Sequence, residues 1–142
     1  MRALFDVNML LALFDVGHVQ HELANTWWDA HRNAGWASCA ITQNGFLRII
    51  STRSYTGRIS LADAILLLRG QMTIEGHELW PAGVSVTDPQ IFDHDHLLGP
   101  NQITDAFLLA LAVQNNGRLV TFDRGIPLGA VRGAENRHLV VL

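Results

Sequence analysis

The sequence predicts an α/β fold: one domain with a central, mainly parallel sheet of about five strands and helices on both faces. Short apolar runs of strand length alternate along the chain with longer segments of helical spacing, an order typical of parallel sheets covered by helices. The chain has 142 residues, of which 49% are hydrophobic, enough for one sizeable core. No linker, repeat or low-complexity run divides it, so we expect residues 1–142 to form a single domain.

The first strand is predicted at residues 2–5, before Asp6 turns the chain into an apolar helix at 9–14. In doubly wound folds, a first strand that begins this early lies more often in the middle of the sheet than at its edge, so Asp6 should lie near the centre. A helix is predicted at 21–34, where apolar residues recur at helical spacing, and a second strand at 36–41.

The next segment predicts two helices joined by a polar loop. Thr42 has the character of an N-cap, and the helix that it opens should run to about Ser51. Residues 52–58 form the loop. Ser60 and Asp63 then have the spacing of a capping box, with an acid where glutamate or glutamine is usual, and they open a strongly apolar helix.

The C-terminal half begins with a weak strand at 77–80. The segment 82–101 is rich in glycine and proline and is predicted as loop with a short helix over 89–94. The remaining elements are a helix at 104–116 and strands at 119–122 and 138–142.

The charge composition excludes a large basic field for binding nucleic acid, because the net charge is −3. All ten basic residues are arginine, which a GC-rich genome explains and which also suits bidentate phosphate contacts. The single cysteine, Cys39, cannot form an internal disulfide, and no apolar run approaches the roughly 18 residues that span a bilayer. No leader segment is recognisable. We therefore expect a soluble, cytoplasmic protein with no membrane contact.

Three carboxylates stand at element ends. Asp6 follows the first strand, Asp105 lies in the first turn of the helix 104–116, and Asp123 follows a late strand. The carboxyl ends of parallel strands and the starts of the helices that follow them share one edge of the sheet, where ligands bind. Three acids at that edge would repel one another unless a cation neutralised them, and oxygen ligands favour Mg²⁺ or Mn²⁺.

Such a site suits phosphodiester hydrolysis, because a divalent cation activates water and stabilises the charge on the transferring phosphoryl group. A doubly wound nucleotide-binding enzyme is a weaker alternative. It lacks support because Asp6-Val7-Asn8 stands after the first strand in place of a glycine-rich G-x-G-x-x-G fingerprint.

Four segments in this order resemble a PIN domain, and more narrowly the VapC toxins of bacterial VapBC toxin-antitoxin pairs. They span nearly the whole chain and read Asp6-Val7-Asn8, Ile41-Thr42-Gln43-Asn44-Gly45-Phe46-Leu47-Arg48, Thr104-Asp105-Ala106-Phe107-Leu108-Leu109-Ala110-Leu111-Ala112 and Leu119-Val120-Thr121-Phe122-Asp123-Arg124.

The resemblance implies a Mg²⁺- or Mn²⁺-dependent endoribonuclease, the toxin component of a type II toxin-antitoxin system. It implies that acids at the positions of Asp6, Asp105 and Asp123 are catalytic and hold the metal. It also implies a cognate VapB-type antitoxin whose C-terminal segment blocks the site, and toxin homodimers in the assembled complex.

One position departs from the family pattern, which commonly has a glutamate where this chain has Gln43. An amide oxygen can ligate a metal or orient a water, but it brings no charge and cannot act as a general base. The alternative function is therefore a catalytically weak or inactive PIN-like module that binds RNA or protein. Three aspartates remain sufficient for a cation site, and activity is the favoured reading.

Polar neighbours supply further candidates. Asn8 and Thr121 can hydrogen-bond the carboxylates or their waters as a supporting layer. Arg48 and Arg124 are candidates for RNA phosphate contact. The run His94-Asp95-His96 lacks the paired spacing of zinc sites and is expected to be a solvated loop.

Two tryptophans offer an aromatic surface. Trp27 and Trp28 can in principle stack nucleobases. Their place in a helix of apolar spacing favours core packing or contact with the antitoxin instead.

Overall fold

A five-stranded sheet organises the computed structural model, which describes residues 1–142. All four strand pairings are parallel and the order is β3-β2-β1-β4-β5, so the first strand lies in the middle, as predicted. The strands are β1 (Ala3–Phe5), β2 (Trp36–Ser38), β3 (His77–Leu79), β4 (Arg118–Thr121) and β5 (Leu139–Val141).

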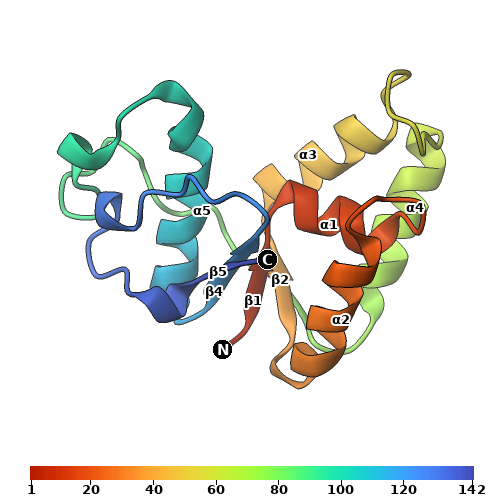
Figure 1. The fold of residues 1–142 in the computed structure, drawn as a ribbon, viewed down its shortest axis with the longest axis horizontal. Coiled ribbons are helices and arrows are strands. Elements are labelled where there is room, and N and C mark those ends of the chain that lie inside the picture. Colours follow the sequence, from red (N-terminus) through yellow and green to blue (C-terminus); the bar gives the residue numbers. More distant parts are fainter.

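Five α-helices cover the two faces of this sheet, which confirms the predicted α/β architecture (Figure 1). α5 lies on one face, and α1 and α2 lie on the other with α3 and α4 packed beyond them. The helices are α1 (Val7–Phe14), α2 (His21–His31), α3 (Ala40–Ile50), α4 (Leu61–Thr73) and α5 (Ile103–Gln114). None of them is long and apolar enough to cross a membrane.

The central strand alternates between two hydrophobic cores because successive side chains of a strand point to opposite faces. Leu4 packs into the core around α5, whereas Ala3 and Phe5 pack into the core under α1 to α4. The edges of both Trp27 and Trp28 meet the ring of Phe5, with centroids 6.3 and 5.5 Å away. Both tryptophans therefore pack against the core, which is one of the two roles that their helical spacing predicted.

The boundary between β2 and α3 differs from the prediction. The strand ends at Ser38 rather than at 41, and Cys39 is the N-cap of a helix that begins at Ala40. Thr42 is the third residue of that helix, and its hydroxyl accepts a 3.0 Å hydrogen bond from the Cys39 amide. This reciprocal contact moves the helix start three residues toward the N-terminus, because Thr42 supports the cap from inside the first turn.

Two other helix starts depend on side-chain caps. α1 begins at Val7, two residues earlier than predicted, because the Asp6 carboxylate caps it. Ser60 caps α4 as predicted and accepts a 3.1 Å hydrogen bond from the Asp63 amide. The helix predicted at 21–34 divides, since α2 ends at His31 and a 3₁₀ turn follows.

The segment 82–101 is loop, but the short helix predicted at 89–94 is wrong. Turns occupy residues 89–91, and Phe92 forms an antiparallel bridge with Val131 that fixes it in the core around α5. A 3₁₀ turn at His94–His96 follows, capped by Asp93. A buried aromatic anchor, not a helical periodicity, therefore decides the shape of this segment.

Candidate active site

Asp6 lies at the carboxyl end of the central strand and at the N-terminus of α1, which makes it the middle of the sheet edge. Its Oδ1 accepts a 2.7 Å hydrogen bond from the Met9 amide, as an N-cap does. Its Oδ2 accepts a 2.5 Å hydrogen bond from the Thr121 hydroxyl on the neighbouring strand. Both oxygens are therefore fixed, and the residue is only 7% exposed.

The pKa of Asp6 is raised from 3.8 to about 6. Burial is the largest cause, because it disfavours the charged form. The hydrogen bonds from Thr121 and Met9 act in the opposite direction and lower the pKa. The negative charges of Asp105 and Asp123 raise it further, so the three predicted acids are near enough to act on one another.

Asp105 is the third residue of α5, where the helix dipole favours a negative charge. It is half-buried and its carboxylate makes no hydrogen bond within the chain. Its pKa is raised, first by burial and then by the charge of Asp123. This carboxylate is free to bind an external group.

Asp123 follows β4 and is exposed. Its amide donates a 2.9 Å hydrogen bond to the Thr121 hydroxyl oxygen, and its Oδ1 accepts one of 2.6 Å from the Gly125 amide. Thr121 is fully buried and so joins the backbone of one acid to the side chain of another. Arg124 is exposed beside Asp123 and forms no ion pair.

No basic side chain neutralises these acids. The chain has five ion pairs, and none includes Asp6, Asp105 or Asp123. The carboxylates also do not converge on a shared point, since no three His, Cys, Asp or Glu side chains lie close enough to hold a metal ion together. The edge therefore carries uncompensated negative charge in an open arrangement.

The side chain of Gln43 makes its hydrogen bond away from the three aspartates. Its amide nitrogen donates a 2.9 Å hydrogen bond to the hydroxyl oxygen of Ser38, which lies 2.8 Å from Nε2 of His77. Ser38 is fully buried, and Gln43 lines a small cleft between α3 and α4 with Leu47. No sequence spacing connects these three residues, because β3 and β2 become neighbours only in the folded sheet.

The other predicted candidates differ in their contacts. Thr121 makes the predicted hydrogen bond to a site carboxylate. Asn8 and Arg48 are exposed, and their side chains form no hydrogen bond within the chain. His94 and His96 are exposed and are held within their own loop, through contacts with the Val86 carbonyl and Asp93.

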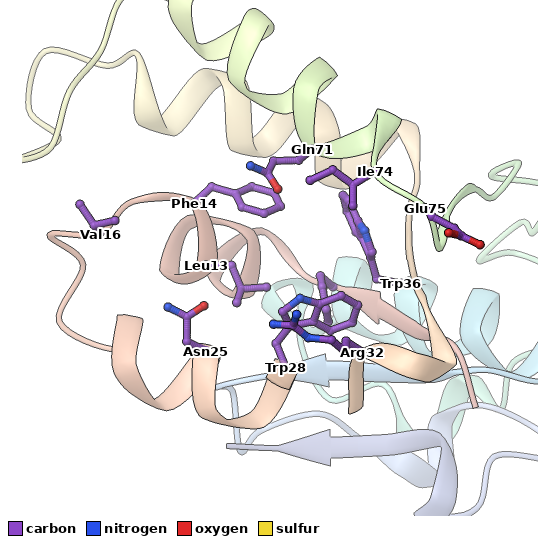
Figure 2. A pocket seen from close by; sticks show the side chains of 11 residues that line it. Leu13, Phe14, Val16, Asn25, Trp28, Arg32, Trp36, Gln71, Ile74 and Glu75 are labelled. Atoms are coloured by element: carbon purple, nitrogen blue, oxygen red, sulfur yellow. The ribbon is translucent and has the colours of Figure 1, made fainter. Parts of the chain in front are cut away.

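A groove lined by both apolar and polar side chains lies apart from the three aspartates, between α1, α2 and the end of α4 (Figure 2). It has a volume of about 370 Å³. Phe14, Trp28, Trp36, Gln71 and Ile74 are among the side chains that line it. The groove carries none of the acidic chemistry described above.

Comparisons with known proteins identify the family of this chain. The family model "PIN domain" matches residues 3–130. The chain is 53% identical over 142 residues to "Ribonuclease VapC44" of Mycobacterium tuberculosis, with all of both chains covered. It is 38% identical over 135 residues to "Ribonuclease VapC39" of the same organism, covering 94% of this chain and 96% of the relative.

Solved structures share the fold at low sequence identity. A toxin-antitoxin complex from Klebsiella pneumoniae matches with a TM-score of 0.59 and 19% identity, covering 98% of this chain and 96% of that one. VapC20 of Mycobacterium tuberculosis, described as a Sarcin-Ricin loop cleaving toxin, matches with a TM-score of 0.58 and 11% identity, covering 82% and 85%. The match to the family model and the identity to curated relatives decide the assignment: this chain belongs to the PIN domain family, in its VapC branch.

Proposed function

We propose that this chain is a divalent-cation-dependent endoribonuclease, the toxin of a type II toxin-antitoxin pair, with Asp6, Asp105 and Asp123 as its catalytic acids. The observation that carries the proposal is the group of carboxylates at the carboxyl edge of the sheet: Asp105 and Asp123 raise the pKa of Asp6, Asp123 raises that of Asp105, and no ion pair includes any of the three. Relatives covered over nearly their whole length are named ribonucleases, which supports RNA as the substrate.

The donor set fits Mg²⁺ or Mn²⁺. These cations take oxygen ligands, and Mg²⁺ is usually held by one or two carboxylates while it keeps several waters and binds substrate phosphates. An open arrangement of three acids satisfies that requirement without a closed cage. When bound, the cation would supply a nucleophilic water and stabilise the charge on phosphorus.

The three aspartates would contribute to the site in different ways. Asp6 is held in one orientation by Met9 and Thr121, so it supplies a fixed ligand at the centre of the edge. Asp105 has no partner within the chain and supplies a second carboxylate from the start of α5. Asp123 is exposed and lies on the solvent side of the site, where an RNA phosphate would approach.

Two exposed arginines would contact the RNA backbone. Arg124 follows Asp123 directly and carries an unpaired guanidinium, which suits contact with the phosphate next to the cleaved bond. Arg48 is equally free on α3. Both contacts would position RNA without reading its sequence.

An inactive binding module is the second candidate, and it depends on Gln43. The amide is bonded to Ser38 and is not among the charges that act on Asp6. The absence of a carboxylate at this position therefore leaves the three aspartates as they are, and an active enzyme remains the better-supported proposal.

We further propose a cytoplasmic VapB-type antitoxin as the partner, and a toxin homodimer within the complex. Two structural relatives were solved as toxin-antitoxin assemblies, one from Klebsiella pneumoniae and one, VapBC2, from Rickettsia felis bound to promoter DNA. The groove of Figure 2 supports a protein partner, since Ile74 and Val16 at its rim are 58% and 82% exposed.

Cleavage of RNA by the purified, antitoxin-free chain tests the proposal. We expect cleavage of total RNA with Mg²⁺ or Mn²⁺, none in EDTA, and a loss of roughly 100-fold or more in Asp6→Asn or Asp105→Asn. Asp95→Asn is the matched control, because Asp95 is exposed and its carboxylate has no partner. Equal cleavage by the wild type and the site variants would leave the binding module as the function.

A further inference from the structure

Positive charge is concentrated in one part of this acidic chain. Residues 48–69 contain four arginines and one acid, whereas the rest of the chain contains six arginines and twelve acids. The segment comprises the end of α3, the loop that follows it and most of α4, which together form a helical hairpin. The hairpin therefore carries a local excess of positive charge in a protein whose net charge is −3.

The arginines of this hairpin also lack acidic partners, and the only side-chain hydrogen bond among them runs from Nε of Arg58 to the Ser51 carbonyl, at 3.1 Å. All four are exposed and none forms an ion pair: Arg48, Arg53, Arg58 and Arg69. Exposed arginines elsewhere mostly have acidic partners, namely Arg32 with Asp29, Arg132 with Asp93 and Arg137 with Glu135. An unneutralised group of guanidiniums attracts an anion with several charges.

Asp15, which follows α1, packs against the hairpin loop and forms no ion pair with its arginines. Asp15 accepts a 2.6 Å hydrogen bond from the Tyr55 hydroxyl through Oδ2 and one of 3.0 Å from the Gly17 amide through Oδ1. The loop also approaches this carboxylate closely at Gly57, where a Cβ would lie 2.5 Å from Oδ2. These contacts fix the loop to the end of α1, so the backbone that carries Arg53 and Arg58 is held in place.

The hairpin begins at the acidic edge and extends away from it. Figure 1 shows α3 starting beside the first turn of α1 and running outward to the yellow loop. The two helices touch at Gly45, where a Cβ would lie 2.5 Å from a methyl group of Val7, the residue after Asp6. α3 has 11 residues and is therefore about 16 Å long. Arg48 and Arg53 lie at its far end.

We propose that this α3–α4 hairpin, residues 48–69, binds the phosphate backbone of the RNA as the strand leaves the acidic site. The proposal rests on the ribonuclease function proposed above. Guanidinium groups bind phosphates in a bidentate fashion, and such contacts position a strand without reading its sequence. The exposed hydroxyls of Ser54 and Thr56 add donors on the same loop.

The test measures RNA affinity in the absence of cleavage. Fluorescence anisotropy of a labelled single-stranded oligouridylate is recorded in EDTA over a series of salt concentrations. The variant Arg48→Gln/Arg53→Gln removes two free charges from the hairpin. The control Arg32→Gln/Arg137→Gln removes two charges that have acidic partners elsewhere, so both proteins have the same net charge.

We expect the hairpin variant to bind the oligouridylate at least about tenfold more weakly than the wild type at low salt. The reason is that a charge-assisted hydrogen bond to phosphate is roughly twice as strong as a neutral one. The slope of log affinity against log salt should fall by about 1.4, because each contact to a single strand contributes about 0.7. The control should retain the wild-type affinity and slope. Thermal unfolding confirms that the variants fold, as exposed substitutions usually change stability by about 0.5 kcal/mol or less.

Either of two results from the variants would overturn the proposal. One is wild-type affinity and slope in the hairpin variant, and the other is an equal loss in the control, which would show that only net charge matters. A wild type that binds no oligouridylate also overturns it. If the hairpin variant loses RNA binding while the wild type cleaves no RNA with either cation, the ribonuclease function fails and the hairpin is still supported as an RNA-binding surface.

Discussion

Thr121 donates a 2.5 Å hydrogen bond to Asp6, a residue 115 positions away in the sequence, and the same hydroxyl oxygen accepts the amide of Asp123. One buried threonine thus holds two of the three site acids in a fixed relation. The pairing of β1 with β4 makes the contact possible, because it brings the ends of the two strands together at the same edge.

Asp6→Asn is expected to stabilise the cation-free protein at pH 7.5. The folded protein raises the pKa of this carboxyl from 3.8 to about 6. Ionised Asp6 therefore disfavours the folded state, by about 3 kcal/mol at 1.36 kcal/mol per unit. Asparagine keeps the cap of α1 without the charge. Chemical denaturation in EDTA measures the gain.

The sign of this effect fixes its pH dependence. Protonated Asp6 favours the folded state, so that stability is fully present below pH 3.8 and is lost as the pH rises through about 6. The advantage of Asp6→Asn should vanish near pH 4. If Asp6→Asn is less stable than the wild type at both pH 7.5 and pH 4, burial of the charge is not what destabilises the folded protein. The control Asp95→Asn should leave the unfolding free energy unchanged at both pH values.

Stabilisation by a divalent cation should depend on pH in the opposite direction. Cation binding needs the ionised carboxylate, so the rise in Tm on adding Mn²⁺ should be largest above pH 7 and should shrink below about pH 6. Paired melts in Mn²⁺ and EDTA from pH 5 to pH 8 measure this. A rise of equal size at pH 5 would place the cation away from Asp6.

Thr121→Val should damage both stability and cleavage. The valine has nearly the same shape but cannot donate to Asp6 or accept from Asp123, so a buried carboxylate and an amide lose partners. We expect a loss of roughly 1 to 3 kcal/mol in unfolding free energy. The pKa of Asp6 should rise further, which moves the acid limb of the pH–rate profile upward. Thr121→Ser should restore the profile, whereas a purely structural role would leave it unmoved in both.

Gln43→Glu is expected to leave cation affinity within about twofold of wild type. Ser38 and His77, not the site acids, surround this side chain, and its amide nitrogen is the donor to Ser38. A carboxylate cannot donate that bond, so a small loss of stability of about 1 kcal/mol is expected. Mn²⁺ titration of the wild type and Gln43→Glu measures this affinity. A clear gain in the variant would show that position 43 is a ligand position.

The positions of the three aspartates were predictable because Asp6 and Asp123 follow apolar strands and Asp105 opens an apolar helix, so the alternation of strands and helices places all three at the same edge. The contacts of Gln43 could not be predicted from the sequence, because Ser38 and His77 meet only when β2 and β3 pair. The start of α3 was missed because a cysteine occupies the cap and Thr42 supports it from within. Sequence thus located the acids, while side-chain orientation required the fold.

The central claim is that the acidic edge binds a divalent cation, and Mn²⁺ titration followed by electron paramagnetic resonance tests it directly without any RNA. We predict that wild type and Asp95→Asn bind Mn²⁺ alike, and that Asp6→Asn, Asp105→Asn and Asp123→Asn each bind at least about tenfold more weakly, as expected when a charged oxygen ligand is lost. Wild-type affinity in all three site variants, or no binding by the wild type, would contradict it.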